Sequence, residues 1–152
     1  MTNLYLWLKA IHVLAVTIWL GAAMTIFAVT GLMTRTTERH RLAAFARVCD
    51  FTGLRLIAPA GGIAFLAGIA ATIAGHVPMQ LWVWWGILAA LLVLSIGGAM
   101  LGRGFRRLCG LLDVQAPDEA AAMALLGRLR GVATALIVVL AVTVIVMVLK
   151  PV

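Results

Sequence analysis

Lys9, His12 and Trp19 occur in the first long apolar segment, 4-LYLWLKAIHVLAVTIWLGAAM-24. At 100° per residue, Lys9, His12 and Trp19 fall on one face of a helix. His12 would lie about 12 Å from the start of that helix at 1.5 Å per residue. An ionisable group at this depth in a bilayer is costly, so it must be paired, hydrogen-bonded or functional. The long Lys9 side chain can extend to the interface, whereas that of His12 cannot.

Two interpretations of His12 are open. A neutral imidazole can donate a hydrogen bond to a carbonyl or hydroxyl group of a neighbouring helix. Alternatively, His12 is an axial ligand of haem, a ligand of copper or a proton-handling group. His76 lies at the same end of the predicted fold, in a turn, so His12 and His76 are the candidate metal ligands. Soft ligands are also conceivable among the methionines Met24, Met79 and Met100.

The composition indicates which structure positions these residues. Of the 152 residues, 64% are hydrophobic and 11% are charged, and the mean hydropathy is +1.14. Soluble domains have about 45–50% apolar and about 25% charged residues. A single water-soluble core could not bury so much apolar surface, so we predict that the lipid bilayer is the solvent. The net charge of +7 comes without aromatic-basic motifs, and we predict no nucleic-acid partner.

Four segments are long and apolar enough to span a membrane, which takes about 20 residues each. They are approximately residues 4–32, 56–75, 81–101 and 132–149. The fold class is therefore all-α, a transmembrane four-helix bundle, and residues 1–152 form a single integral membrane domain. No basic stretch precedes the first segment, so we expect it to be retained rather than cleaved as a signal peptide.

The basic residues predict the orientation. Ten of the twelve lysines and arginines lie in the two segments that connect spans 1 and 2 and spans 3 and 4, and the turn 75-GHVPMQ-80 has none. The positive-inside rule places both connectors in the cytoplasm. Both termini then face the periplasm, in a multi-pass protein of the bacterial inner membrane. Cys49 and Cys109 fall on the cytoplasmic side, where thiols stay reduced.

Further local patterns concern the connectors and the contacts between helices. Segment 38–51 is predicted to be an amphipathic surface helix or an extension of span 2, and Pro117 with the acidic pair after it predicts a helix start. Pro59 permits a local kink. Small residues favour close helix packing, and Thr72 could bond to a neighbouring helix. In span 2 these residues are Ala60, Ala64, Gly68 and Thr72, and in span 3 Gly86, Ala90, Gly98 and Gly102.

The chain resembles a bacterial family of predicted four-span integral membrane proteins of unknown function. The resemblance rests on the K-x-x-H and W-x-G of span 1, the R-x-x-x-P-A of span 2, 82-WVWWGIL-88 and 147-MVLKP-151. It is also distantly similar to the copper-resistance-D-type membrane domains and the J-type membrane protoporphyrinogen oxidases. The latter resemblance implies a haem-bearing bundle with His12 as axial ligand. The J-type oxidases place a functional lysine early in span 3, where this sequence has Trp84-Trp85-Gly86.

The leading hypothesis is a small membrane redox or metal-associated protein. Its candidate cofactor is haem b, bound through His12 with Lys9, Trp19 and Arg55 as supporting residues. One alternative is a non-catalytic partner or assembly subunit, packed against another membrane protein or a second copy. The other is a copper-handling component. No Ser/His/Asp grouping, paired carboxylates or phosphate-binding loop occurs, so no catalytic residue is assigned and enzymatic activity is left open.

Overall fold

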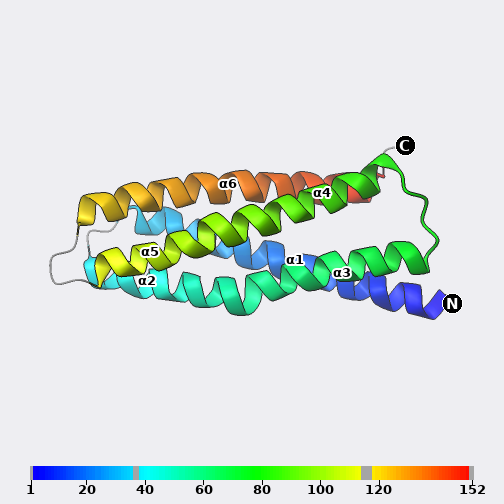
Figure 1. The fold of residues 1–152 in the computed structure, drawn as a ribbon, viewed down its shortest axis with the longest axis horizontal. Coiled ribbons are helices and arrows are strands. Elements are labelled where there is room, and N and C mark those ends of the chain that lie inside the picture. Colours follow the sequence, from blue (N-terminus) through cyan, green and yellow to red (C-terminus); the bar gives the residue numbers. More distant parts are fainter. Residues whose placement is uncertain (1, 36–37, 114–117, 151–152) are drawn as a thin grey trace.

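The computed structural model describes residues 2–35, 38–113 and 118–150, and all of the elements in these ranges are helices. Four long helices lie side by side in an elongated bundle (Figure 1). Each of the four is long and apolar enough to cross a membrane. The elements are α1 (Thr2–Met33), α2 (Arg39–Thr52), η1 (Gly53–Ile57), α3 (Ala58–Ala74), α4 (Leu81–Ile96), η2 (Gly97–Gly102), α5 (Arg103–Leu112) and α6 (Glu119–Leu149).

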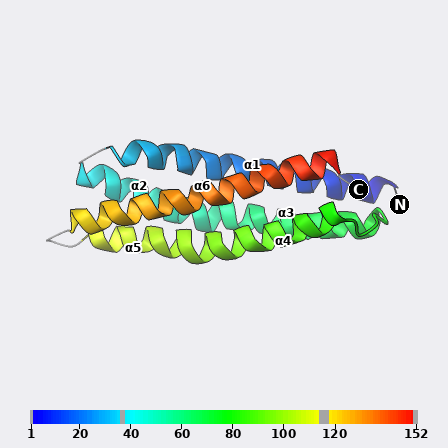
Figure 2. The same ribbon diagram turned by 90° about the horizontal axis from the view of Figure 1, so that it is seen from above.

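The start of α1 and the end of α6 lie at the same end of the bundle as the turn between α3 and α4, and the view from above agrees (Figure 2). We call this the turn end. The opposite end holds α2, α5 and the start of α6, and with them most of the arginines. We call it the basic end. The two predicted connectors therefore meet at one end of the molecule, as an antiparallel four-helix bundle requires.

Both middle helices contain a wide π-helical turn. The first, η1, joins α2 to α3, and in it the Ala58 N–H donates to the Gly53 carbonyl five residues earlier. Pro59 has no N–H, so the Arg55 carbonyl lacks its usual donor four residues later, and a wider turn accommodates this loss. The second, η2, is the glycine-rich 97-GGAMLG-102 that joins α4 to α5. The two π turns lie against each other.

Spans 2, 3 and 4 extend well beyond their predicted bounds at the basic end, whereas α1 ends at Met33, close to its predicted end. Segment 38–51 is the extension of span 2 that the sequence allowed, since α2 runs through η1 into α3. The last helix begins at Glu119, capped by Asp118, whose carboxylate accepts from the Ala121 N–H at 2.9 Å. Pro117 of the predicted helix start lies outside the described residues. The Thr72 prediction is wrong, because its hydroxyl donates to the Gly68 carbonyl of its own helix.

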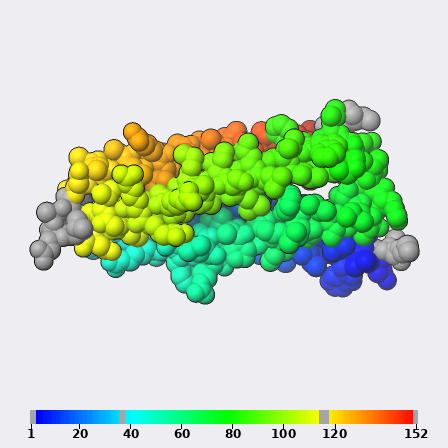
Figure 3. Space-filling view, in the orientation of Figure 1, coloured from blue at the N-terminus to red at the C-terminus, as the bar shows by residue number. Residues whose placement is uncertain are grey.

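The bundle is packed differently along its length. At the basic end, large side chains of α2, α5 and α6 form a cluster that includes Phe45, Phe105 and Leu126. In the middle, small residues such as Ala60 and Ala64 surround Trp19. Large apolar side chains cover the outside of the spans, as suits a surface in lipid. In the space-filling view the surface is hollowed between α3 and α4 close to their turn (Figure 3).

Candidate functional site

His12 lies between α1 and α3 and is held by a backbone carbonyl. Its Nδ1 is 2.6 Å from the Ala64 oxygen. A carbonyl oxygen only accepts, so Nδ1 carries the proton and donates this hydrogen bond. The α3 helix thereby fixes both the ring orientation and, for a neutral imidazole, the tautomer. This is the hydrogen bond to a neighbouring helix that the first interpretation of His12 predicted.

Gly68 provides the space for the imidazole. A Cβ atom built on Gly68 would lie 2.9 Å from both Nδ1 and Cε1 of His12. Contacts this short are repulsive, and the ring cannot retreat without losing the bond to Ala64. Glycine at position 68 is therefore required by the approach of His12.

The same arrangement recurs at two other levels of the α1–α3 contact. A Cβ atom on Gly75 would lie 2.7 Å from the Tyr5 ring, and one on Gly61 would lie 2.9 Å from the Trp19 ring. The rings follow at seven-residue intervals along α1, and the glycines follow at the same intervals in the opposite direction along α3. We call this set of three ring–glycine pairs the ring–glycine seam. The seven-residue spacing in both segments was present in the sequence, although the pairing between them was not predicted from it.

The second imidazole nitrogen of His12, Nε2, is left available. Nδ1 makes the residue's hydrogen bond, and His12 is half-buried. Among the described residues that are not exposed, no enclosed side-chain nitrogen or oxygen lacks a hydrogen-bond partner. Since Nε2 has no such partner, it must reach the accessible surface of the bundle. In the neutral Nδ1–H form, Nε2 carries a lone pair that can accept a proton or bind a metal.

The other predicted site residues differ in their exposure and in their distance from His12. Trp19 is 4% exposed and lies two turns from His12 in the ring–glycine seam. Lys9 is exposed and borders a shallow apolar groove on the outside of α1. Arg55 is exposed in η1, with its guanidinium 5.8 Å from the Phe51 ring centre. It is nine residues from Ala64, about 13 Å along the helix, so Arg55 and His12 lie at different levels.

His76 is placed in the turn rather than beside His12. It is exposed, with a positive φ of 47°, and it follows Gly75, which packs against Tyr5. Gly75 is seven residues from Gly68, about 10 Å along the helix. The two histidines therefore lie at different levels of the bundle. The described part of the chain contains no group of three His, Cys, Asp or Glu residues suited to a metal.

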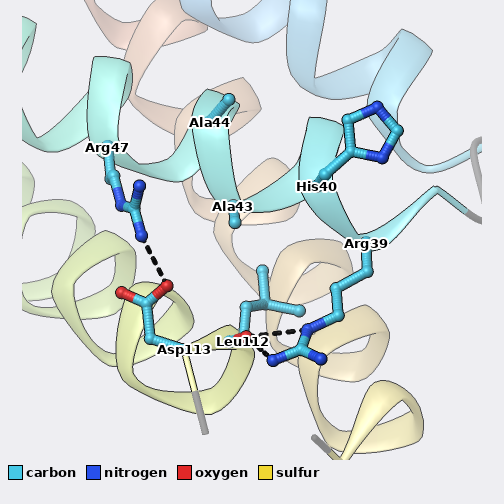
Figure 4. A pocket seen from close by; sticks show the side chains of 7 residues that line it. All are labelled: Arg39, His40, Ala43, Ala44, Arg47, Leu112 and Asp113. Carbon is cyan, nitrogen blue, oxygen red and sulfur yellow. Dashed lines mark hydrogen bonds and ion pairs between the residues drawn. The ribbon is translucent and has the colours of Figure 1, made fainter. Parts of the chain in front are cut away.

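Three arginines at the basic end join α2 to α5, and Figure 4 shows Arg39 and Arg47 among them. Arg39 donates from Nε and Nη2 to the Leu112 carbonyl, at 2.9 and 2.7 Å, and so satisfies the end of α5. Arg47 pairs with Asp113 at 2.6 Å, and these residues border an open cleft of about 390 Å³. Elsewhere on the same contact, Arg106 pairs with Asp50 at 3.2 Å. From the sequence these arginines were interpreted only as topology signals, because their partners lie more than 50 residues away.

The two cysteines differ in accessibility. Cys49 is 2% exposed, and burial raises the pKa of its thiol to about 12. Cys109 is half-buried. We expect a thiolate-specific maleimide at pH 7.5 to modify Cys109 at least tenfold faster than Cys49 in the folded protein. Mass spectrometry of single-cysteine variants measures both rates, and equal rates before denaturation would contradict this assignment.

Comparison with known proteins finds no matching family model, curated protein or solved structure for this chain. Family membership and haem binding therefore remain expectations from the resemblance described above.

Proposed function

We propose that this is a multi-pass protein of the bacterial inner membrane in which His12 binds haem b or another metal through Nε2, in a redox or metal-handling role. The observation that supports it is the hydrogen bond from Nδ1 to the Ala64 carbonyl. Metal-bound histidines commonly donate their other ring N–H to a carbonyl or carboxylate, which fixes the ring and raises its basicity. His12 already makes such a hydrogen bond through Nδ1.

The donor chemistry is compatible with a cofactor held through one protein ligand. Imidazole is the usual proximal ligand of haem. Trp19 is buried against α3 on the same face of α1, and Lys9 and Arg55 are cations at different levels of the bundle. We assign neither cation a direct contact. With the positive-inside rule, the proposed site lies in the periplasmic half of the membrane.

The proposal is tested by comparing three versions of the protein purified in mild detergent. The wild type should show a Soret band or a stoichiometric metal, measured by absorption spectroscopy and elemental analysis. His12→Asn should lose it completely but stay folded, because the Asn amide can still donate to the Ala64 carbonyl while it has no Nε2 ligand. His12→Ala should lose both the cofactor and some stability.

The proposal fails if the wild type is colourless and metal-free after expression with added haem precursor, iron and copper. It also fails if His12→Asn retains the full cofactor content. Elemental analysis separates the two metal hypotheses: iron with a Soret band indicates haem, and copper without one indicates copper handling.

A partner or assembly subunit is the second candidate, and a specific observation favours it. Gly98 and Gly102 form a G-x-x-x-G in η2, yet a Cβ atom on either would meet nothing within 4 Å. By contrast, Gly86 in α4 packs against Met147. Glycine pairs of this spacing let helices approach closely in membranes. An open pair is therefore available to another membrane protein or a second copy, and crosslinking in native membranes tests this.

A further inference from the structure

The arginines at the basic end fall into two groups by their partners. Arg39, Arg47 and Arg106 bind groups of neighbouring helices, and Arg41 pairs with Glu38 at 2.6 Å. The remaining arginines are exposed, and within residues 2–35, 38–113 and 118–150 none of them is paired with a carboxylate. They are Arg35, Arg55, Arg103, Arg107, Arg128 and Arg130.

Arg130 differs from the others in this second group because two helices fix its position. It projects from α6, and its Cζ lies 5.8 Å from the centre of the Phe27 ring of α1. A Cβ atom built on Gly31 would lie 3.5 Å from its Cζ and Nη2. The guanidinium thus lies across α1 at the glycine, where there is no side chain to displace it. A cation–π contact of this kind orients the guanidinium plane and leaves its N–H groups free to donate.

Arg35 is exposed in the turn just after α1. It follows Gly31 by four residues, and its N–H donates to the Leu32 carbonyl at 3.1 Å in the turn that ends α1. Residues four apart are neighbours on a helix surface. Two arginines, one just after α1 and one in α6, therefore lie within about one helical turn of Gly31, and neither has a carboxylate partner among the described residues.

The depth of this pair indicates what it can bind. Arg130 precedes the apolar segment of α6 by two residues, and Arg35 follows that of α1 by three. At 1.5 Å per residue both lie about 3–5 Å outside the apolar layer. The headgroup layer is about 5–8 Å thick on each side of the hydrocarbon core. Both residues therefore lie near the boundary between the predicted apolar layer and the headgroups, and Met24, one turn from Phe27, is exposed on the apolar side.

We propose that Arg130 and Arg35, both close to Gly31, bind the phosphate of an anionic phospholipid headgroup between α1 and α6. The planar guanidinium matches phosphate oxygens with two parallel hydrogen bonds. Two cations at one phosphate also favour a lipid with net negative charge over a zwitterionic one, whose own cationic group would meet Arg35 or Arg130.

The test uses the full chain in detergent micelles, titrated with dioleoylphosphatidylglycerol or dioleoylphosphatidylcholine. Native mass spectrometry counts bound lipid, and thermal unfolding measures its stabilising effect. We expect the protein to bind at least one phosphatidylglycerol, with a half-saturating concentration about tenfold lower than that of phosphatidylcholine. Arg130→Gln should raise that half-saturation about tenfold, which corresponds to the loss of a bidentate charged contact. Arg35→Gln, which disturbs no helix contact, should raise it severalfold.

The matched control is Arg128→Gln, which removes the same charge from the same helix two residues away. An equal loss in Arg128→Gln and Arg130→Gln would overturn the proposal, because it would show only diffuse attraction between a basic protein and acidic lipids. Inorganic phosphate at 10 mM and constant ionic strength provides the other arm (about ten-thousandfold above a micromolar lipid affinity). If it displaced the lipid, the site would be one for soluble phosphate, and the lipid assignment would be wrong.

Discussion

Replacing Gly68 with valine will destabilise the protein by about 3 kcal/mol. The new Cβ would lie 2.9 Å from two atoms of the His12 ring. Relief requires the ring to move, and this breaks the hydrogen bond to Ala64. Overpacking costs about 1–3 kcal/mol, and an unsatisfied N–H inside a bilayer adds about 1–3 kcal/mol.

Gly62→Val is the matched control, since it makes the same change on the same helix. A Cβ on Gly62 meets nothing within 4 Å, so only the small difference in helix propensity remains. Reversible unfolding of both variants, by titration of sodium dodecyl sulfate into mild detergent, gives the two free energies. Equal destabilisation would show that the contact with the His12 ring is not the reason why position 68 requires glycine. In the proposed cofactor site, Gly68→Val would also reduce haem or metal content without touching Nε2.

The ring–glycine seam explains how α1 and α3 associate where the hydrophobic effect contributes little. In lipid, helices approach through small residues and van der Waals contact. Seven-residue spacing corresponds to 3.5 residues per turn, which keeps a seam between two helices that cross at a small left-handed angle. Each ring fills the space that a glycine leaves open, so His12 is one of three similar contacts. The lone pair on its Nε2, which can accept a proton or bind a metal, makes it chemically different from the other two, Tyr5 and Trp19.

The sequence was sufficient to predict the four helices and that both basic connectors lie at one end, but it did not predict how far the helices extend. Hydropathy marks residues 56–75 and 81–101 because they are uniformly apolar. The structure continues both helices through η1 and η2 into α2 and α5, whose arginines lower the hydropathy but still alternate with buried residues such as Phe45 and Phe105. A helix that leaves the membrane needs only one apolar face, and an apolar window does not detect it.

The candidate site was predictable in part. Lys9, His12 and Trp19 were assigned to one face of α1, and the structure places His12 and Trp19 toward α3, whereas Lys9 is exposed at the edge of that face. The partner of His12 could not be predicted, since any residue type can supply a backbone carbonyl such as that of Ala64. The links from Arg39 and Arg47 to α5 were missed for a similar reason. Their partners are a carbonyl and an aspartate that only the tertiary fold brings close.

Replacing Trp19 with alanine will lower the free energy of unfolding by about 2–3 kcal/mol. The side chain is 4% exposed and belongs to the central cluster of α1, α3, α4 and α6. Large-to-small changes of this kind cost about 3–5 kcal/mol in soluble cores. We expect less here because the unfolded reference state in the bilayer also surrounds the ring with apolar groups, so mainly the packing contacts are lost. Trp84→Ala, at a side chain 51% exposed, should change the stability by less than about 0.5 kcal/mol.

A double-mutant cycle with Gly61→Ala tests the ring–glycine pairing itself. Alone, Gly61→Ala places a Cβ 2.9 Å from the Trp19 ring and 2.7 Å from a methyl group of Leu94. In the Trp19→Ala background the contact with the ring is gone and only Leu94 must adjust. The cost of Gly61→Ala should therefore fall by about 1 kcal/mol, within the range of couplings between touching residues. If the two costs simply added, Trp19 and Gly61 would not act as a pair. The seam would then be a consequence of helix contact rather than its cause.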